Sequence, residues 1–165
     1  MNKLFFILGN QLFHPEIIKN HGCNEIFMSE DFGLCTYEKH HKLKIYLFLC
    51  AMREYKDELV SNGLNVHYYT LNDRKKDQNY LSFFNDFIKS HNFEEINFFE
   101  IEDKPFEKNI INGFKSNSIN YKIHSSPMFM FEKDEFRDFN KNNKVYRLSS
   151  FYQYGRKKFN ILIDE

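Results

Sequence analysis

The stretch KLFFILG, residues 3–9, places a short run of apolar side chains between a lysine and a glycine. An apolar run of this length without alternation is typical of a strand that is buried on both faces of a parallel sheet. Such a strand needs a layer of helices on each side, because neither face can be left to water. The stretch therefore predicts an α/β protein whose first strand lies inside the sheet.

Comparable segments recur along the chain and alternate with stretches of helical periodicity. We predict further strands at 24–30, 65–71, 95–101 and 119–124. We predict helices from Tyr37 to about Asn62, with Gly63 as the C-cap, and at 80–91, 105–116 and 132–140, with part of the tail helical as well. This alternation predicts an α/β fold, a doubly wound parallel sheet of about five strands with flanking helices.

The chain has 165 residues, with 23 Lys plus Arg and 23 Asp plus Glu. This size predicts one α/β domain at residues 1–140, followed by an aromatic and basic segment at 141–165. The balanced charge gives no overall field that would attract nucleic acid or an anionic membrane. No apolar run approaches the ~20 residues of a membrane span, and no signal peptide is recognisable, so we expect a soluble, cytoplasmic protein.

The stretch LCTYEKHHKLKIYLFLCAM, residues 34–52, carries two adjacent histidines at the start of a predicted helix. On a helix, Tyr37, His41, Lys44 and Phe48 share one face, whereas His40 points about 100° away. Two neighbouring helical histidines do not readily ligate one ion, so we assign no metal site, and we assign no catalytic residue. The face is either the polar first turn of a buried helix or the wall of a pocket for a planar, polar ligand.

Polar segments follow four of the predicted strands: GNQL (9–12), SEDFGLCTY (29–37), NDRKK (72–76) and EIEDKP (100–105). In an open α/β sheet, ligands bind outside the carboxyl ends of the strands, so we expect the pocket at these segments. Thr36 is expected to cap the helix that follows it. The charged loop at 72–79 is expected to lie in solvent.

Three segments carry a resemblance to a known family. They are FILGNQL (6–12), CTYEKHHKLKIYLFLCAMREYKDEL (35–59) and YRLSSFYQYGRKKFNILID (146–164). Together they resemble the N-terminal domain of photolyase-related proteins, in the bacterial cryptochrome and photolyase branch that carries an iron–sulfur cluster and includes six-four photolyases. The family pattern is G-D-Q-L, then Y-x-x-H-H-K-x-K-I-x-x-x-x-x-A-M-R, then a basic segment rich in Phe and Tyr.

The resemblance implies a Rossmann-like antenna domain that holds a ribityl lumazine as light-harvesting pigment and packs on a helical domain. In the family, that helical domain carries FAD, an iron–sulfur cluster with four cysteine ligands and the DNA-repair chemistry. We therefore expect FAD, the cluster and contact with DNA to belong to a missing helical domain or to a separate helical chain. We expect no FAD-dependent repair from this chain alone, and the resemblance leaves open whether the chain is an enzyme.

The resemblance also assigns roles to single positions. Ser29, Tyr37 and Phe48 match positions that line the pigment pocket of the family. Asn10 stands where the family usually has Asp. Leu34 replaces an acidic residue that in the family hydrogen-bonds the lumazine ring.

The residues themselves complete the candidate site. We expect close backbone approach to the ligand at residues 9–11, apolar walls from Tyr37 and Phe48, and polar contacts from His41 and Lys44. The full set of candidate cofactor-binding residues is Gly9, Asn10, Gln11, Ser29, Leu34, Tyr37, His41, Lys44 and Phe48.

Two alternatives belong to other classes of function. The chain is an interaction module if the Phe and Tyr residues of 146–163 dock on a separate catalytic chain. It is an unrelated small-molecule-binding domain if only the fold is shared. The basic stretch YGRKKF, residues 154–159, is either a phosphate-contacting patch or a solvated turn, and the neutral net charge favours the turn.

Overall fold

The computed structural model describes residues 2–75, 78–141, 145 and 147–163. One compact unit ends at Ser126, and a second begins at Pro127. The division predicted from the sequence lies at 140, whereas the structure groups residues 127–140 with the tail. Residues 142–144, 146, 164 and 165 of the expected tail segment lie outside the described residues.

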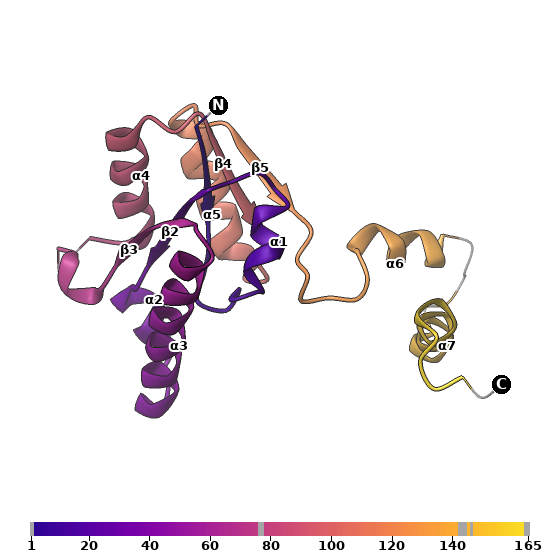
Figure 1. The fold of residues 1–165 in the computed structure, drawn as a ribbon. Helices are drawn as coiled ribbons and strands as arrows, with labels where there is room; N and C mark the ends of the chain where they lie inside the picture. The colour runs from indigo at the N-terminus through magenta and orange to yellow at the C-terminus, as the bar shows by residue number, and fades with distance from the viewer. Residues whose placement is uncertain (1, 76–77, 142–144, 146, 164–165) are drawn as a thin grey trace. The chain divides into compact units, whose positions relative to one another are not determined.

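The first unit contains a sheet of parallel strands: β1 (Lys3–Phe6), β2 (Glu25–Ser29), β3 (Asn65–Tyr69), β4 (Glu95–Phe99) and β5 (Tyr121–His124). They lie in the order β3-β2-β1-β4-β5, with β1 in the centre (Figure 1). Leu4 of β1 pairs with Glu25 of β2 on one side and with Ile96 of β4 on the other. The predicted doubly wound parallel sheet is confirmed, and each strand lies within its predicted range.

Helices cover both faces of this sheet (Figure 1). The helices α1 (Pro15–Lys19) and α3 (Lys42–Ser61) pack on one face, and α4 (Tyr80–His91) and α5 (Lys104–Ser116) pack on the other. Alternate side chains of a strand point to opposite faces. Phe5 of β1 accordingly joins the core under α1 and α3, whereas its neighbours on either side join the core under α4 and α5.

Aromatic rings fix α4 to the sheet. The ring centroid of Phe27 lies 4.5 Å from that of Phe84 and 4.7 Å from that of Phe87. Phe6 lies 5.0 Å from Phe84 in the same cluster. Each such pair stabilises by about 0.5–1.5 kcal/mol beyond the burial of its surface. The high phenylalanine content therefore serves the core at these positions.

The prediction of one helix from Tyr37 is wrong about its start. A short helix, α2 (Phe32–Thr36), ends before Tyr37, and α3 begins only after His41, which is its N-cap. Thr36 does not cap α3, because its hydroxyl donates to the carbonyl of Phe32 within α2. The short helices α1 and α2 were not predicted, because neither is long enough to show a periodic apolar pattern.

The C-terminal end of α3 agrees with the sequence. Ser61 is its last residue, and Gly63 adopts a left-handed conformation with φ of 81°, which glycine reaches without strain. In the described part of the chain, no helix combines the length and the apolar character that crossing a membrane requires.

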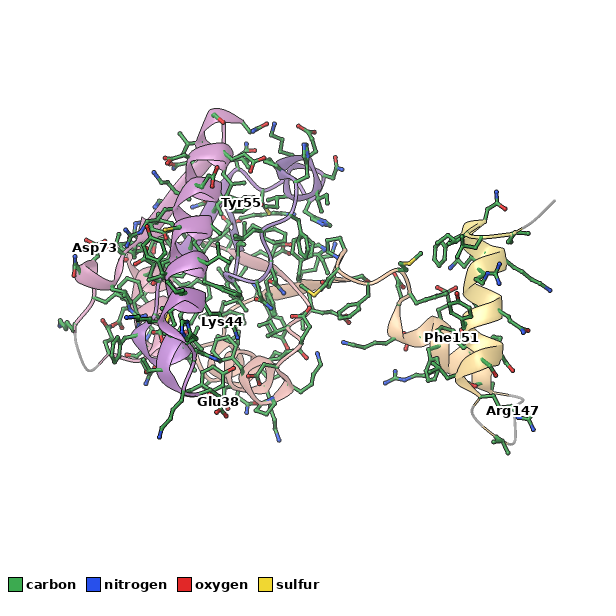
Figure 2. The ribbon with its side chains drawn as sticks, turned by 90° about the horizontal axis from the view of Figure 1, so that it is seen from below. Glu38, Lys44, Tyr55, Asp73, Arg147 and Phe151 are labelled. Carbon is green, nitrogen blue, oxygen red and sulfur yellow. The ribbon has the colours of Figure 1, made fainter. Side chains whose placement is uncertain are left out.

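In the described residues of the second unit, two helices pack together through aromatic rings. Two rings of α6 (Lys133–Asn140) pack on Phe151 of α7 (Leu148–Phe159), which is labelled in Figure 2. Phe131, which precedes α6, packs on the same residue, and the two ring centroids lie 4.6 Å apart. A Cβ atom at Gly155 would lie 2.8 Å from the ring of Phe131. The glycine therefore allows α7 to approach this ring closely.

Replacement of Phe84 by alanine tests the aromatic cluster. Phe84 is fully buried, so Phe84→Ala should lower the free energy of unfolding by about 3–5 kcal/mol, measured by urea denaturation. Phe32→Ala is the matched control, because Phe32 is 67% exposed and its truncation should change the free energy of unfolding by less than about 0.5 kcal/mol. Equal effects of the two substitutions would contradict this description of the core.

Candidate functional site

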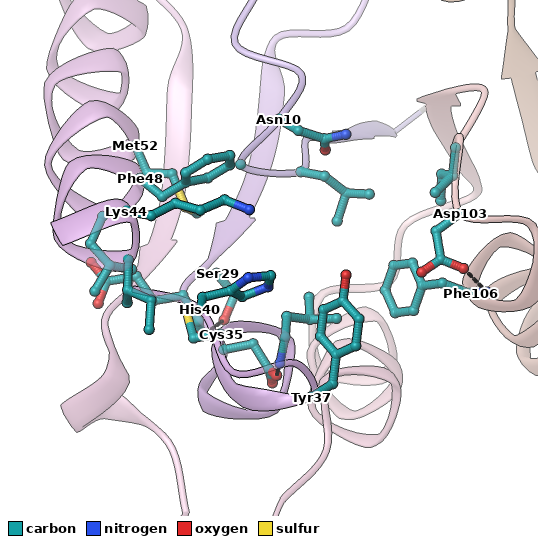
Figure 3. Close-up of a pocket in the computed structure, with 18 residues that line it drawn as sticks. Asn10, Ser29, Cys35, Tyr37, His40, Lys44, Phe48, Met52, Asp103 and Phe106 are labelled. Carbon is teal, nitrogen blue, oxygen red and sulfur yellow. Dashed lines mark hydrogen bonds between the residues drawn. The ribbon is translucent and has the colours of Figure 1, made fainter. Parts of the chain in front are cut away.

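A pocket of about 280 Å³ lies at the carboxyl edge of the sheet, beside the segments that follow β1, β2 and β4 (Figure 3). The strand order reverses here, because β2 lies on one side of β1 and β4 on the other. Such a switch point is where open α/β sheets bind ligands. The volume is close to the lower end of the range for small-molecule sites, roughly 300–1,000 Å³.

Most of the predicted candidate residues line this pocket: Gly9, Asn10, Ser29, Leu34, Tyr37, Lys44 and Phe48. Tyr37 and Lys44 do not share a helical face as the sequence analysis assumed, because Tyr37 is the C-cap of α2 and Lys44 lies in α3. The loop between the two helices nevertheless brings both side chains to the same pocket (Figure 3). Whether these residues hold a cofactor stays a prediction.

Two candidate residues do not line the pocket. Gln11 is fully buried, and its Nε2 donates to the carbonyl of Glu100 at 2.8 Å, which ties the segment after β1 to the segment after β4. His41 caps α3, since its Nδ1 accepts from the backbone N–H of Leu43 at 3.2 Å. His40 lines the pocket instead of His41.

Gly9 lines the pocket, but its small size also serves the packing of the protein. A Cβ atom at this position would lie 2.7 Å from Sδ of Met52 and 3.6 Å from the ring of Phe48. Both of these side chains belong to α3. The glycine therefore lets α3 lie directly against the segment after β1.

Several pocket residues were missed by the sequence analysis, namely Cys35, His40, Met52, Asp103 and Phe106. Asp103 and Phe106 follow β4, and Asp103 is the N-cap of α5, with its Oδ1 accepting from the backbone N–H of Phe106 at 3.0 Å. The sequence did indicate that Asp103 lies near the pocket, because EIEDKP (100–105) is one of the polar segments that follow a predicted strand. What the sequence could not show is that the loop after β4 turns toward α3.

Glu30 forms a buried hydrogen-bond network beside the pocket. Its Oε1 accepts from Nε of Arg53 at 2.6 Å and from the hydroxyl of Tyr68 at 2.8 Å. Its Oε2 accepts from Arg53 and from the backbone N–H of Leu71, each at 3.0 Å. Burial by itself would raise the pKa of Glu30, but these hydrogen bonds and the charge of Arg53 outweigh it and lower the pKa. Glu30 is therefore ionised and has both oxygens occupied.

Asp31 forms an ion pair with Arg74 that is buried on both sides, since each side chain is only 5% exposed, whereas the Arg53 partner of Glu30 is 55% exposed. Arg74 also donates to the carbonyl of Glu30 at 3.0 Å and to that of Gln78 at 2.8 Å. The prediction that the loop at 72–79 lies in solvent is therefore wrong for Arg74, while residues 76 and 77 lie outside the described part. The arginine is drawn inward because a buried Asp31 requires a partner.

Metal binding has no support among the described residues. No group of three or more His, Cys, Asp or Glu side chains in this part of the chain could hold a metal ion. Cys23, Cys35 and Cys50 are free thiols.

Comparison with known proteins shows the family. The model of the deoxyribodipyrimidine photo-lyase-related protein family matches residues 5–165. The chain belongs to this family. A (6-4) photolyase of Agrobacterium fabrum is 27% identical over 172 residues, which cover 99% of this chain and 33% of the relative. This photolyase-related protein thus spans about a third of the length of that curated relative.

The pH dependence of stability tests the Glu30 network in this photolyase-related protein. Because folding lowers the pKa of Glu30, its carboxylate stabilises the folded state at neutral pH, and this contribution is lost as the pH falls below about 4.5. Glu30→Gln should have a lower Tm at pH 7 and a smaller fall in Tm between pH 5 and pH 3 than the wild type.

Glu54→Gln provides the control for this experiment. Glu54 is an exposed residue of the same helix as Arg53, so the variant should keep the wild-type dependence of Tm on pH. A Glu30→Gln protein with the full wild-type fall in Tm on acidification would contradict the assigned role of Glu30.

Proposed function

We propose that the α/β unit of this photolyase-related protein binds a ribityl lumazine as an antenna chromophore. It would serve a FAD-containing helical domain or chain, which would supply the iron–sulfur cluster, the contact with DNA and the repair chemistry. The unit would have no FAD-dependent repair activity by itself. We propose a cytoplasmic location for it.

The observation that carries this proposal is the position and lining of the pocket. It lies at the switch point of the sheet, and the aromatic side chains Tyr37, Phe48 and Phe106 line it together with Leu34. Apolar and aromatic walls with a few convergent polar groups are typical of sites for ring-shaped ligands. A planar heterocycle fits these residues better than a phosphate group does, since no glycine-rich phosphate loop follows β1.

Polar side chains would orient such a ring. Lys44 and His40 point into the pocket from one side, and the hydroxyl of Tyr37 points into it from the α2–α3 loop (Figure 3). All three can donate hydrogen bonds to carbonyl oxygens or ring nitrogens. When bound, the lumazine supplies absorption of near-ultraviolet light.

Leu34 and Asn10 depart from the family pattern, and the structure shows what each of them contacts. Leu34 lines the pocket and packs against the core under α4 and α5, so it offers the ligand an apolar contact. Asn10 donates from its Nδ2 to Oε2 of Glu102 at 3.2 Å, so its amide is already engaged. The expected lumazine-binding carboxylate at position 34 is therefore absent, and other groups must orient the ring.

A titration with ribityl lumazine tests the proposal. The wild-type chain should shift the absorbance of the lumazine, and it should gain about 2.7 kcal/mol of stability when the ligand is present at 100 times its Kd. Lys44→Met should weaken binding by about ten-fold or more, because a hydrogen bond from a charged group contributes roughly 1.5–3 kcal/mol.

Lys42→Met is the matched control for the titration. Lys42 lies in the same turn of α3 and is exposed, but it does not line the pocket, so its replacement should leave the Kd unchanged. A wild-type chain that shows neither an absorbance shift nor a rise in Tm with lumazine or with flavin would overturn the proposed function.

A second candidate function, that of an interaction module, is favoured by the apolar surface of the second unit. Leu148 is 82% exposed and Tyr152 is 59% exposed. These two residues border an apolar groove of about 620 Å³ together with Met130 and Phe131. Exposed apolar patches of this kind mark surfaces that contact a partner.

Two basic residues of the tail are engaged in contacts within the second unit. Lys158 forms an ion pair with Glu135, and Arg156 donates to the carbonyl of Ile161 at 3.2 Å. Lys158 is therefore neutralised within the unit, whereas Arg156 keeps its positive charge while it is held by a carbonyl.

Co-expression with a FAD-binding helical chain of the same family tests this second candidate. The two chains should co-elute in size-exclusion chromatography with flavin absorbance in the shared peak. The double substitution Leu148→Ser and Tyr152→Ser should abolish co-elution, whereas Val60→Ser, at an exposed apolar position of α3, should retain it. Separate elution of the wild-type chain as a monomer would contradict the module.

A further inference from the structure

The polar groups of the pocket are divided between two walls. Lys44, His40 and Tyr37 come from α3 and the loop before it, and Asp103 lies on the other side, at the start of α5 (Figure 3). Within the described residues, neither the ammonium of Lys44 nor the hydroxyl of Tyr37 has a hydrogen-bond partner. One wall thus offers donors, and the other offers a carboxylate.

The other carboxylates that line the pocket have their oxygens occupied. Both oxygens of Glu30 accept hydrogen bonds from the protein. The Oδ1 of Asp31 accepts from the backbone N–H of Leu34 at 2.6 Å, and its Oδ2 is paired with Arg74. Glu30 cannot accept from a ligand unless it gives up one of its hydrogen bonds, because each of its oxygens already accepts two. Each oxygen of Asp31 is already held by one donor of the protein.

Asp103 differs from both of them. Its Oδ1 caps α5 by accepting from the backbone N–H of Phe106. Its Oδ2 has no partner in the described part of the chain, and the residue is exposed toward the pocket side of the sheet edge. The helix cap therefore holds the carboxylate in place while one oxygen remains available.

We propose that Asp103 is the specificity-determining acceptor of this pocket. Its Oδ2 accepts a hydrogen bond from a ring N–H of the ligand, and the opposite wall donates to acceptor atoms elsewhere on the ring. The class of ligand is a planar heterocycle that carries both an imide N–H and carbonyl or ring-nitrogen acceptors. This inference rests on the proposed function, because it assigns a role within the same pocket.

The substitution Asp103→Asn tests the role of the free oxygen without removing the helix cap. The asparagine Oδ1 can still accept from Phe106, since asparagine is a good N-cap residue. The atom in the position of Oδ2 then becomes an NH₂ donor that faces the ring N–H, and both the charge and the acceptor are lost. The variant should keep the wild-type Tm without ligand and bind ribityl lumazine about ten- to hundred-fold more weakly.

A lumazine methylated at the imide nitrogen supplies a readout that a purely structural role would not change. The wild type should bind the unmethylated lumazine more tightly than the methylated one by about ten-fold or more. Asp103→Asn should lose this preference. Glu38→Gln is the control: Glu38 lies at the same end of α3 as Lys44 (Figure 2) but does not line the pocket, so this variant should behave as the wild type.

The outcomes separate this inference from the proposed function. If the wild type binds lumazine and Asp103→Asn binds it equally well, or keeps the preference for the unmethylated ring, the role of Asp103 is overturned and the pocket proposal stands. If the wild type binds neither ring, both proposals are overturned. Weaker binding and a lost preference in Asp103→Asn, with Glu38→Gln unchanged, support the assignment.

Discussion

The central strand β1 is the constraint on which the rest of the first unit depends. It pairs in parallel with β2 on one side and with β4 on the other, and its side chains are buried on both faces. Parallel neighbours require crossover helices, and the two faces require a helical layer each. The segments that follow β1, β2 and β4 must therefore leave the same edge in different directions. The pocket lies where they separate.

Two ion pairs, each with a buried carboxylate, set the electrostatic character of that edge. Glu30 holds Arg53 of α3, and Asp31 holds Arg74 from the segment after β3. Charges buried in this way are costly unless each finds its partner and further hydrogen bonds. Here both carboxylates are neutralised by the protein itself. The polar groups that a ligand meets are consequently Lys44 of α3, Tyr37 before it and Asp103 at the start of α5.

Membership of the photolyase-related family gives this arrangement its biological setting. The chain covers about a third of the (6-4) photolyase that it resembles. The first unit has a pocket lined by aromatic residues, and the second unit has exposed apolar residues. Both features are compatible with the proposed association with a helical chain. The two proposed roles are also compatible with each other, because one uses the edge of the sheet and the other uses the surface of α7.

The sequence by itself determined the parallel sheet, the range of every strand and most of the long helices. Continuous apolar runs and helical periodicity are local patterns, and they show which side chains of a segment are buried. The sequence also located the pocket at the strand ends, since this follows from parallel topology. Only the tertiary structure decided that α3 starts after His41, so that His40 lines the pocket and its neighbour caps the helix. It alone decided that Arg74 turns inward and that Asp103 faces Lys44 across the pocket. The inward turn of Arg74 depends on a partner that lies 43 residues away, Asp31, and no local pattern encodes which distant partner a polar side chain will find. The approach of Asp103 and Lys44 likewise depends on elements far apart in the chain. The cap of α3 by His41 is a local contact, but the periodic apolar pattern does not show at which residue a helix begins.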